Sequence, residues 1–327
     1  MTGKILVTTR SFRKLDGPHQ QILRDAGYEI VNSPYARRAT ADELAELVGD
    51  VEAVIMGLDE CTAPVIAHAE KLKVISRYGI GIDNVDLSAA TAAGIVVTNT
   101  PGANALAVAE HTFALMLAIA RSVPLQDRHV HADDFAPISG VELYESTLGL
   151  IGMGRIGREV ALRAAAFGMR ILYYDPFPPP DDLLTQTGAE SREVRDLLAE
   201  SDFVSLHAPL TDESHHLINA ATMAVMKPTA YLINTARGGL VDEAALYTAL
   251  RDGQIAGAAF DVFAEEPPTG NPLLTLDNFI ATPHSGSATR QTTLRMGLMA
   301  AQNALMVLRG ERPPHVVNPQ VYERDQH

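Results

Sequence analysis

The sequence contains a single cysteine, Cys61, no tryptophan and no long hydrophobic run. One cysteine excludes an internal disulfide, which fits a reducing compartment and favours a cytoplasmic location. The longest apolar stretch, residues 112–120, lies between charged neighbours and is too short to span a bilayer. The apolar run at the N-terminus is too short for a signal peptide and favours a strand instead.

Positive charge is also scarce. The chain has 26 lysines and arginines against 40 aspartates and glutamates, a net charge of −14. An acidic surface repels nucleic-acid backbones and anionic membranes, so we expect neither as a partner. The sequence has no Cys/His cluster with zinc-ligand spacing and no H-E-x-x-H motif, so we expect no bound metal.

What is present is an alternation of short apolar runs with helical patterns. Over 327 residues, 46% are hydrophobic and 20% charged, which is typical of a globular chain of about two domains. The alternation predicts βαβ units and the α/β class, with two doubly wound parallel sheets. We expect strands at 4–9, 28–31, 53–56, 74–78, 95–98, 147–152, 170–174, 203–206, 231–234, 256–261 and 279–282. We expect helices at 19–26, 40–48, 63–69, 87–93, 105–121, 155–167, 196–200, 242–252 and 289–309.

A glycine-rich turn predicts where a dinucleotide binds. Gly152, Gly154 and Gly157 form a G-x-G-x-x-G motif that follows an apolar run and opens an amphipathic helix. Such glycines let the backbone turn tightly, approach a pyrophosphate and pack helix against strand. Asp175 ends the next strand, where a carboxylate accepts from ribose hydroxyls and repels a 2′-phosphate, so the cofactor is expected to be NAD. The alternative is a structural turn beside a solvated aspartate.

Further segments resemble the D-2-hydroxyacid dehydrogenase family. They are N-T-A-R-G-G-L-V-D at 234–242, D-V-F-A-E-E-P at 261–267, T-P-H-S-G-S-A-T at 282–289, R-Y-G-I-G-I-D-N-V-D at 77–86, N-T-P-G-A-N at 99–104 and A-E-H at 109–111. The resemblance implies a Rossmann cofactor domain, residues 100–286, and a flavodoxin-like substrate domain, residues 1–99 with 287–327, separated by a cleft. It also implies a homodimer formed through the cofactor domain, for which the apolar segment 105–121 is suited; an ordinary core helix is the alternative.

Oxidation of a 2-hydroxy acid, in which a hydride leaves C2 for the nicotinamide and the hydroxyl loses a proton, needs three kinds of side chain. Removing the hydroxyl proton of a 2-hydroxy acid needs a base with a pKa near neutrality, and His284 is the natural choice. Glu266 can orient the imidazole and stabilise its charged form. Arg237 follows a strand end and suits a carboxylate. The resemblance assigns these same roles to the three residues. The alternatives are a turn histidine, a surface glutamate and a solvated arginine.

The resemblance also implies contacts for further residues. It places cofactor contacts at Arg155, Ile156, His207, Ala208, Pro209, Thr235, Ala236, Asp261 and Gly286, where Asp261 accepts from the nicotinamide carboxamide. It places substrate contacts at Arg77, Ile80, Gly81 and Asn104, in addition to Arg237. For Arg77, an ion pair that holds its own loop is an equal alternative.

The substrate is less sharply indicated than the reaction. The pattern is most like 3-phosphoglycerate dehydrogenases, in a short form without a C-terminal regulatory domain. It departs from eukaryotic-type members of that group, because Gly57-Leu58 stands where they carry Arg-Ser, and Ser285 and Ser287 replace apolar residues. Reduction of hydroxypyruvate or glyoxylate, or oxidation of an unusual, phosphonate-like 2-hydroxy acid, are alternatives. A corepressor-like protein that senses NAD is a further alternative, although such proteins usually carry a tryptophan that this chain lacks.

Overall fold

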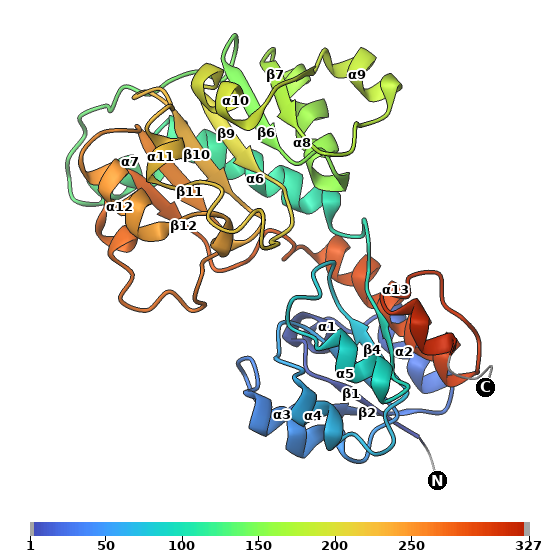
Figure 1. The fold of residues 1–327 in the computed structure, drawn as a ribbon. Coiled ribbons are helices and arrows are strands. Elements are labelled where there is room, and N and C mark those ends of the chain that lie inside the picture. The colour runs from blue at the N-terminus through green and yellow to red at the C-terminus, as the bar shows by residue number, and fades with distance from the viewer. Residues whose placement is uncertain (1–2, 324–327) are drawn as a thin grey trace. The chain divides into compact units, whose positions relative to one another are not determined.

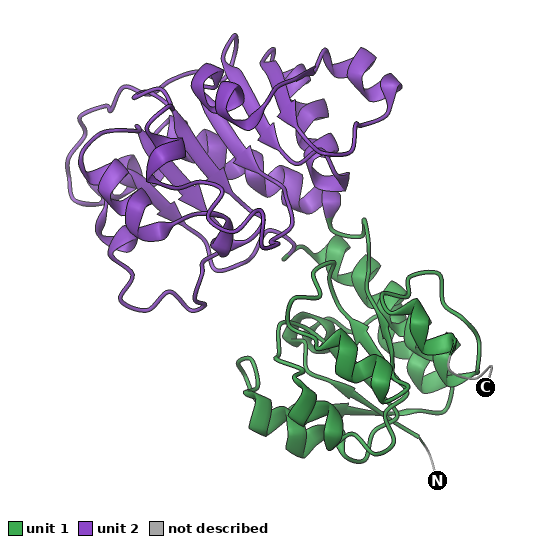
Figure 2. Ribbon diagram, viewed as in Figure 1, with its two compact units in different colours: residues 1–104, 288–327 green, residues 105–287 purple. Residues whose placement is uncertain are grey.

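The computed structural model describes residues 3–323 and divides into two compact units (Figure 2). Unit 1 comprises residues 1–104 and 288–327, and unit 2 comprises residues 105–287. The sequence predicted boundaries after residues 99 and 286. The structure has them after residues 104 and 287, which is five residues and one residue later, respectively. The segment before residue 105 belongs to unit 1 because the Thr100 amide donates to the carbonyl of Gly79 at 2.9 Å. The Arg295 guanidinium likewise donates to the carbonyl of Ala103 at 3.0 Å.

Unit 1 contains a parallel sheet, of which strands β1, β2 and β4 are labelled in Figure 1. The strand order is β2-β1-β3-β4-β5. This is the order of flavodoxin-like domains, which confirms the fold predicted for the unit. The strands are β1 (Lys4–Val7), β2 (Glu29–Asn32), β3 (Ala53–Met56), β4 (Val74–Arg77) and β5 (Val96–Thr98).

Helices cover both faces of this sheet. Successive side chains of a strand point to opposite faces, and β3 therefore gives Val54 and Met56 to one core and Ala53 and Ile55 to the other. The first core is completed by α3, α4 and α5, and the second by α1, α2 and α13. The helices of unit 1 are α1 (Arg10–Lys14), α2 (Pro18–Asp25), α3 (Ala41–Val48), α4 (Ala63–Ala67), α5 (Leu87–Ala92), α13 (Arg290–Leu308) and the short η3 (Pro319–Tyr322).

Unit 2 contains a larger parallel sheet, with the order β12-β11-β10-β9-β6-β7-β8. The chain runs outward from β6 to β8 and then crosses to β9, so the strand order reverses between β6 and β9. Open α/β sheets bind ligands beyond the carboxyl ends of their strands at such a point. The strands are β6 (Thr147–Ile151), β7 (Arg170–Tyr174), β8 (Glu190–Ser191), β9 (Phe203–Leu206), β10 (Tyr231–Asn234), β11 (Gly257–Phe260) and β12 (Phe279–Ala281).

The second sheet is also covered on both faces. Helices α6 and α8 pack in one core cluster, and α10, α11 and α12 pack in the other. Two doubly wound sheets confirm the predicted α/β class. The helices of unit 2 are α6 (Ala105–Ala120), α7 (Val123–His131), α8 (Arg155–Ala166), α9 (Asp181–Thr187), α10 (Val194–Glu200), α11 (Ala220–Met223), α12 (Glu243–Arg251), η1 (Gly238–Leu240) and η2 (Pro272–Thr275).

The sequence did not indicate several of the smaller elements. Helix α7 contains no buried residue, so no apolar stripe marks it. Strand β8 has only two residues, both exposed. The segment after α13 packs along β5, where the Val317 amide donates to the carbonyl of Val97 at 2.8 Å and Asn318 is buried. In the described part of the chain, no single helix is long and apolar enough to cross a membrane; α6 and α7 pass only as a pair, bent by 59°.

Candidate functional site

The glycine motif lies at the point where the strand order of unit 2 reverses. Gly152 follows β6 with a φ of +100°, and a Cβ there would come within 2.7 Å of the Ala208 amide nitrogen. A Cβ on Gly157 would lie 2.1 Å from the carbonyl oxygen of Gly152. Gly154 is different, because it is exposed and a Cβ there would meet nothing within 4 Å. Two glycines thus permit close packing, and the third leaves open space at the N-terminus of α8, which suits a pyrophosphate.

The residues that flank this motif have defined surroundings. The Asp175 carboxylate follows β7 and accepts from the backbone amides of Met153, at 2.6 Å, and Phe177, at 2.8 Å. It is therefore fixed against the glycine loop, where a ribose would follow a pyrophosphate. His207 follows β9, and its Nε2 lies 2.9 Å from the hydroxyl oxygen of Ser205. Burial lowers the pKa of His207 to about 3, so its ring is neutral at physiological pH.

The predicted acid–base pair is formed. His284 follows β12, and its Nδ1 lies 2.9 Å from Oε2 of Glu266. The other oxygen of Glu266 accepts from the Phe263 amide at 3.1 Å, which fixes the carboxylate from the opposite side. The Glu266 side chain is 15% exposed and that of His284 is 30% exposed. A carboxylate on Nδ1 leaves Nε2 to exchange a proton with a substrate, because the two ring nitrogens serve different partners.

The loop that carries Arg237 is packed directly against the loop that carries Glu266. A Cβ on Gly238 would lie 1.9 Å from the carbonyl carbon of Phe263, so only glycine fits at this crossing. The loop is closed by Asn234, whose side-chain amide donates to the carbonyl of Arg237 at 2.9 Å. Arg237 is partly buried, and its Nη1 donates to the carbonyl of Ala236 at 2.7 Å. The three residues predicted to be catalytic thus lie on neighbouring loops at the carboxyl ends of β10, β11 and β12.

Asp261 is the most heavily bonded carboxylate of this region. Its Oδ1 accepts from the Thr282 hydroxyl at 2.5 Å and the Ser285 amide at 2.8 Å, and its Oδ2 accepts from the Gly286 amide at 2.8 Å. Burial alone would raise the pKa of Asp261, but hydrogen bonds from His111, Thr282 and these two amides lower it to about 2. Asp261 is therefore an anion, and its side chain can only accept hydrogen bonds.

The remaining predicted cofactor residues lie around the same strand ends. Thr235 is buried, and its hydroxyl oxygen lies 3.0 Å from that of Thr112 on α6. For the other predicted cofactor residues the structure shows only the position in the fold. Arg155 and Ile156 lie in the first turn of α8, Ala208 and Pro209 follow β9, and Ala236 follows β10.

The predicted substrate residues other than Arg237 lie in unit 1. Arg77 ends β4 and is 5% exposed; its guanidinium donates to the carbonyl of Tyr78 at 2.5 Å and to the side-chain oxygen of Asn84 at 3.3 Å. These bonds favour the alternative in which Arg77 holds its own loop. Ile80 and Gly81 follow in that loop, and the carbonyl of Ile80 accepts from the Asn99 side chain at 2.9 Å.

Asn104 stands at the last position of unit 1 before α6. Its side-chain oxygen is buried and has no hydrogen-bond partner among residues 3–323. A buried amide oxygen without a partner is costly unless a ligand or water donates to it. This favours the predicted role of Asn104 as a contact for a bound molecule.

Two residues next to the site were not predicted. His111 and Thr112 on α6 contact the loops that carry Asp261 and Thr235. The signal in the sequence is the polar run Glu110-His111-Thr112, which interrupts an otherwise apolar helix. Among the described residues, no three His, Cys, Asp or Glu side chains gather as a metal site would require.

Comparison with known proteins places this geometry in a family. Residues 113–286 match the model of the D-isomer specific 2-hydroxyacid dehydrogenase, NAD binding domain. The chain is 45% identical over 294 residues to D-3-phosphoglycerate dehydrogenase of Methanocaldococcus jannaschii, covering 89% of this chain but only 56% of that protein. It is 46% identical over 286 residues to glyoxylate reductase of Korarchaeum cryptofilum, covering 85% of this chain and 86% of that one.

A solved structure agrees over nearly the whole chain. D-Lactate dehydrogenase from Aquifex aeolicus, complexed with NAD and lactic acid, matches with a TM-score of 0.85 and 30% identity, over 97% of this chain and 99% of that one. The chain therefore belongs to the D-isomer specific 2-hydroxyacid dehydrogenase family and is an NAD-dependent oxidoreductase.

Proposed function

We propose that this chain transfers a hydride between NAD(H) and C2 of a small anionic 2-oxo or D-2-hydroxy acid, with His284 as the acid and base. The observation that carries the proposal is the 2.9 Å contact between Nδ1 of His284 and Oε2 of Glu266, beside the Arg237 loop. Bound NADH would supply the hydride, or NAD⁺ accept it. The residues of the chain bind the acid, orient it and move one proton.

The proton step follows from the hydrogen bonds of His284. When the ring is neutral, Nδ1–H donates to Glu266, and Nε2 accepts the hydroxyl proton of a 2-hydroxy acid as the hydride leaves C2. In the reverse direction, the imidazolium returns that proton to the C2 oxygen. The Glu266 carboxylate stabilises the imidazolium in both directions because it holds Nδ1–H. The planar guanidinium of Arg237 suits the substrate carboxylate and polarises the C2 oxygen.

We also propose contacts between the chain and the cofactor, from the surroundings of Gly154, Asp175 and Asp261. The open space beside Gly154 takes the pyrophosphate, and the Asp175 carboxylate accepts from the adenosine ribose. Oδ2 of Asp261, which accepts one hydrogen bond among the described residues, accepts a second from the nicotinamide carboxamide. Thr235 and Gly286 then flank the ring.

For the substrate we propose first an acid of the 3-phosphoglycerate type, as in the relative from Methanocaldococcus jannaschii. A second candidate is an unphosphorylated 2-oxo acid such as glyoxylate or hydroxypyruvate. It is supported by the relative from Korarchaeum cryptofilum and by the surroundings of Arg77, whose guanidinium is buried against its own loop. Gly57 and Leu58 also provide no cation at the position where eukaryotic-type phosphoglycerate dehydrogenases carry arginine.

A matched pair of substrates tests the proposal. Phosphohydroxypyruvate and hydroxypyruvate differ by one phosphate, and their kcat/KM with NADH is followed by absorbance, with glyoxylate as a third substrate. The first candidate predicts a kcat/KM about a hundredfold higher for the phosphate ester, the size of two charge-assisted hydrogen bonds. Equal or lower values for the ester support the second candidate. No oxidation of NADH with any of the three would contradict the proposed function.

We also propose a homodimer formed through unit 2. Helix α6, which we expected to form the interface, is mostly buried in the core of its own unit, as an ordinary core helix would be. The support comes from the segment that follows it, where α7 has no buried residue and apolar side chains are exposed at Val123, Val130, Phe135 and Tyr144. Exposed apolar patches mark interaction surfaces. The mass in solution, measured by light scattering for the wild type and for Phe135→Ser, tests this proposal.

A further inference from the structure

His111 lies beside the proposed nicotinamide site without belonging to the acid–base pair. It projects from α6, and its Nε2 lies 3.0 Å from the hydroxyl oxygen of Thr282 and 3.3 Å from Oδ1 of Asp261. Thr282 donates to the same Oδ1 at 2.5 Å. An imidazole, a hydroxyl and a carboxylate therefore form a closed triangle, in which the His111 side chain is 21% exposed and that of Asp261 is 3% exposed.

The direction of each hydrogen bond in this triangle is fixed. Asp261 is ionised and can only accept. The single hydroxyl proton of Thr282 points to Asp261, so Thr282 must accept from His111. Nε2 of His111 therefore carries a proton in either charge state of the ring, and His111 acts as a donor to both neighbours.

Asp261 in turn holds the backbone at His284 and at the two residues that follow it. Its side chain accepts from the amides of Ser285 and Gly286, both at 2.8 Å, and its own carbonyl accepts from the His284 amide at 2.9 Å. His284 has a φ of +51°, in the left-handed region that non-glycine residues adopt at a cost. These three hydrogen bonds hold that conformation, so the orientation of Asp261 sets the orientation of the loop that carries the base.

The two oxygens of Asp261 are used unequally. Oδ1 accepts from Thr282, the Ser285 amide and His111, whereas Oδ2 accepts only from the Gly286 amide among residues 3–323. Because His111 and Thr282 both hold Oδ1, the plane of the carboxylate cannot turn away from this orientation without losing both donors. Oδ2 is thereby kept as the acceptor for a ligand.

We propose that His111 is a positioning residue. Together with Thr282 it orients the Asp261 carboxylate, so that Oδ2 accepts a hydrogen bond from the nicotinamide carboxamide and the His284 loop keeps its conformation. The inference rests on the proposed function, because it takes the nicotinamide to lie beside Asp261. The next residue of α6 acts in the same sense, since the Thr112 hydroxyl oxygen lies 3.0 Å from that of Thr235. One turn of α6 thus ties the loops after β10, β11 and β12.

The test separates positioning of the nicotinamide from general stability. His111→Phe removes the donor, His111→Gln keeps an amide N–H donor on a flexible side chain, and Thr282→Val removes the other donor without changing side-chain volume. Glu110→Gln, an exposed neighbour on the same helix, is the control. For each variant, the Kd of NADH is compared with the Kd of ADP-ribose, which lacks the nicotinamide, and kcat is measured with the best substrate of the panel. Thermal unfolding checks that each variant is folded.

We expect His111→Phe and Thr282→Val to raise the Kd of NADH and to lower kcat, each about tenfold, while the Kd of ADP-ribose changes less than about twofold. His111→Gln should recover most of the loss, and Glu110→Gln should resemble the wild type. Equal weakening of NADH and ADP-ribose, unchanged NADH binding, or a glutamine variant as impaired as the phenylalanine variant would overturn the inference. Failure of the wild type to bind NADH would overturn the proposed function, and this inference with it.

Discussion

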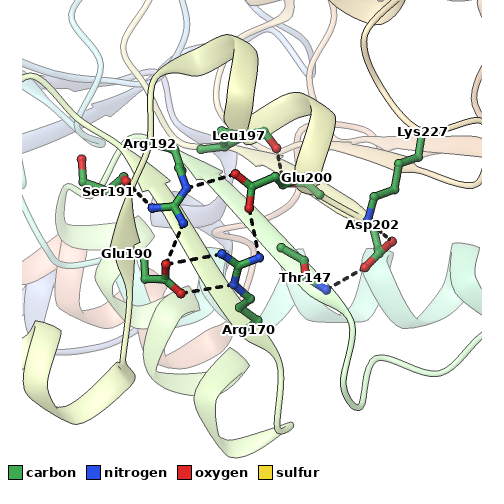
Figure 3. Close-up of polar contacts among 10 residues, drawn as sticks. Thr147, Arg170, Glu190, Ser191, Arg192, Leu197, Glu200, Asp202 and Lys227 are labelled. Carbon is green, nitrogen blue, oxygen red and sulfur yellow. Dashed lines mark hydrogen bonds and ion pairs between the residues drawn. The ribbon is translucent and has the colours of Figure 1, made fainter.

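The two edges of the unit 2 sheet use charge in opposite ways. The term amino edge refers to the residues around the starts of β6, β7 and β9. These residues are Thr147, Arg170, Glu190, Arg192, Glu200, Asp202 and Lys227. There, Arg170 and Arg192 each contact both Glu190 and Glu200 at 2.7–3.2 Å, in a ring of four charges whose side chains are 29–45% exposed (Figure 3). We call the carboxyl edge the strand ends that carry the glycine motif, His207, Arg237, Asp261, Glu266 and His284. There, the ionisable groups are partly or fully buried and are held by backbone amides and by one another.

The difference shows what each arrangement achieves. Exposed ion pairs contribute little to stability, because water screens the charges and ordering long side chains costs entropy. Groups held by several donors have fixed positions, as catalysis requires, and at the carboxyl edge the pKa values of His207 and Asp261 are lowered. The arginines of the amino edge lower the pKa values of Glu190 and Glu200, but no fixed buried geometry results. The carboxyl edge should therefore respond to substitution through activity and ligand binding, and the amino edge through stability alone.

The largest expected effect comes from His284→Asn. Removing the proton acceptor should lower kcat by about a thousandfold, within the range measured for general acid–base catalysis. NADH binding and the Tm should stay near the wild-type values, because the His284 side chain contacts Glu266 and the proposed substrate, and an asparagine amide can still donate to Glu266. Stopped-flow or steady-state absorbance of NADH measures kcat, and fluorescence titration measures Kd. A kcat within a few-fold of the wild type would remove His284 from the proton step.

A smaller effect should follow from Gly154→Ala. The new methyl group enters open space in the protein, so the fold and the Tm should be kept. It takes the space proposed for the pyrophosphate, so the Kd of NADH should rise about a hundredfold, which is the size of an overpacking penalty. The matched control is Gly49→Ala, in unit 1, where a Cβ would make an ordinary contact of 3.6 Å with the carbonyl of His68. If the two alanines bind NADH equally well, the cofactor does not approach Gly154.

Acid should destabilise the carboxyl edge first. Burial lowers the pKa of His207 from 6.5 to about 3. Between these pH values the unfolded chain binds a proton at His207, whereas the folded chain does not. Stability should therefore fall as the pH falls from 6.5 towards 3, by about 2 kcal/mol between pH 6.5 and 5. Urea unfolding at pH 7 and pH 5 measures the loss. His207→Gln should lose less than the wild type, whereas Arg170→Met should lose as much; equal losses in all three would exclude His207 as the cause.

The smallest effect should come from the amino edge. Arg170→Met removes two of the four ion pairs in the ring, but its partners are exposed and keep Arg192. We expect the Tm to fall by about 2 °C or less and kcat to be unchanged. Calorimetry in low and high salt checks the first expectation, because screening should make the two proteins more alike. A large loss of activity would break the distinction between the two edges.

The sequence predicted most of the sheet strands and the proximity of His284 and Glu266, because these features follow from local patterns. A buried parallel strand is a short apolar run, and a residue that follows such a run must lie at the carboxyl edge. His284, Glu266 and Arg237 all follow strands, so their convergence could be anticipated. The glycine motif was identified because three glycines and the strand before them form one continuous segment.

Features that depend on contacts between distant segments could not be predicted in this way. The bond from His111 to Thr282 spans 171 residues, and nothing in the pattern of α6 says which strand end it faces. The burial of Arg77 depends on Asn84 and on the loop that folds back over it. Helix α7 lacks a buried face, so the usual periodicity is absent.

Helix α13 has a consequence for how the chain folds during synthesis. One face of the unit 1 sheet is completed by Met296, Ala300, Ala301, Ala304 and Leu305 of α13, and the Ser76 hydroxyl donates to the carbonyl of Ala300 at 2.8 Å. The 183 residues of unit 2 separate this helix from the strands it covers. Because domains fold from the N-terminus as they leave the ribosome, the first 104 residues emerge with this face covered only by α1 and α2. Unit 2, which is continuous in sequence, can finish folding first, and the core of unit 1 is completed only when its last long helix has been made.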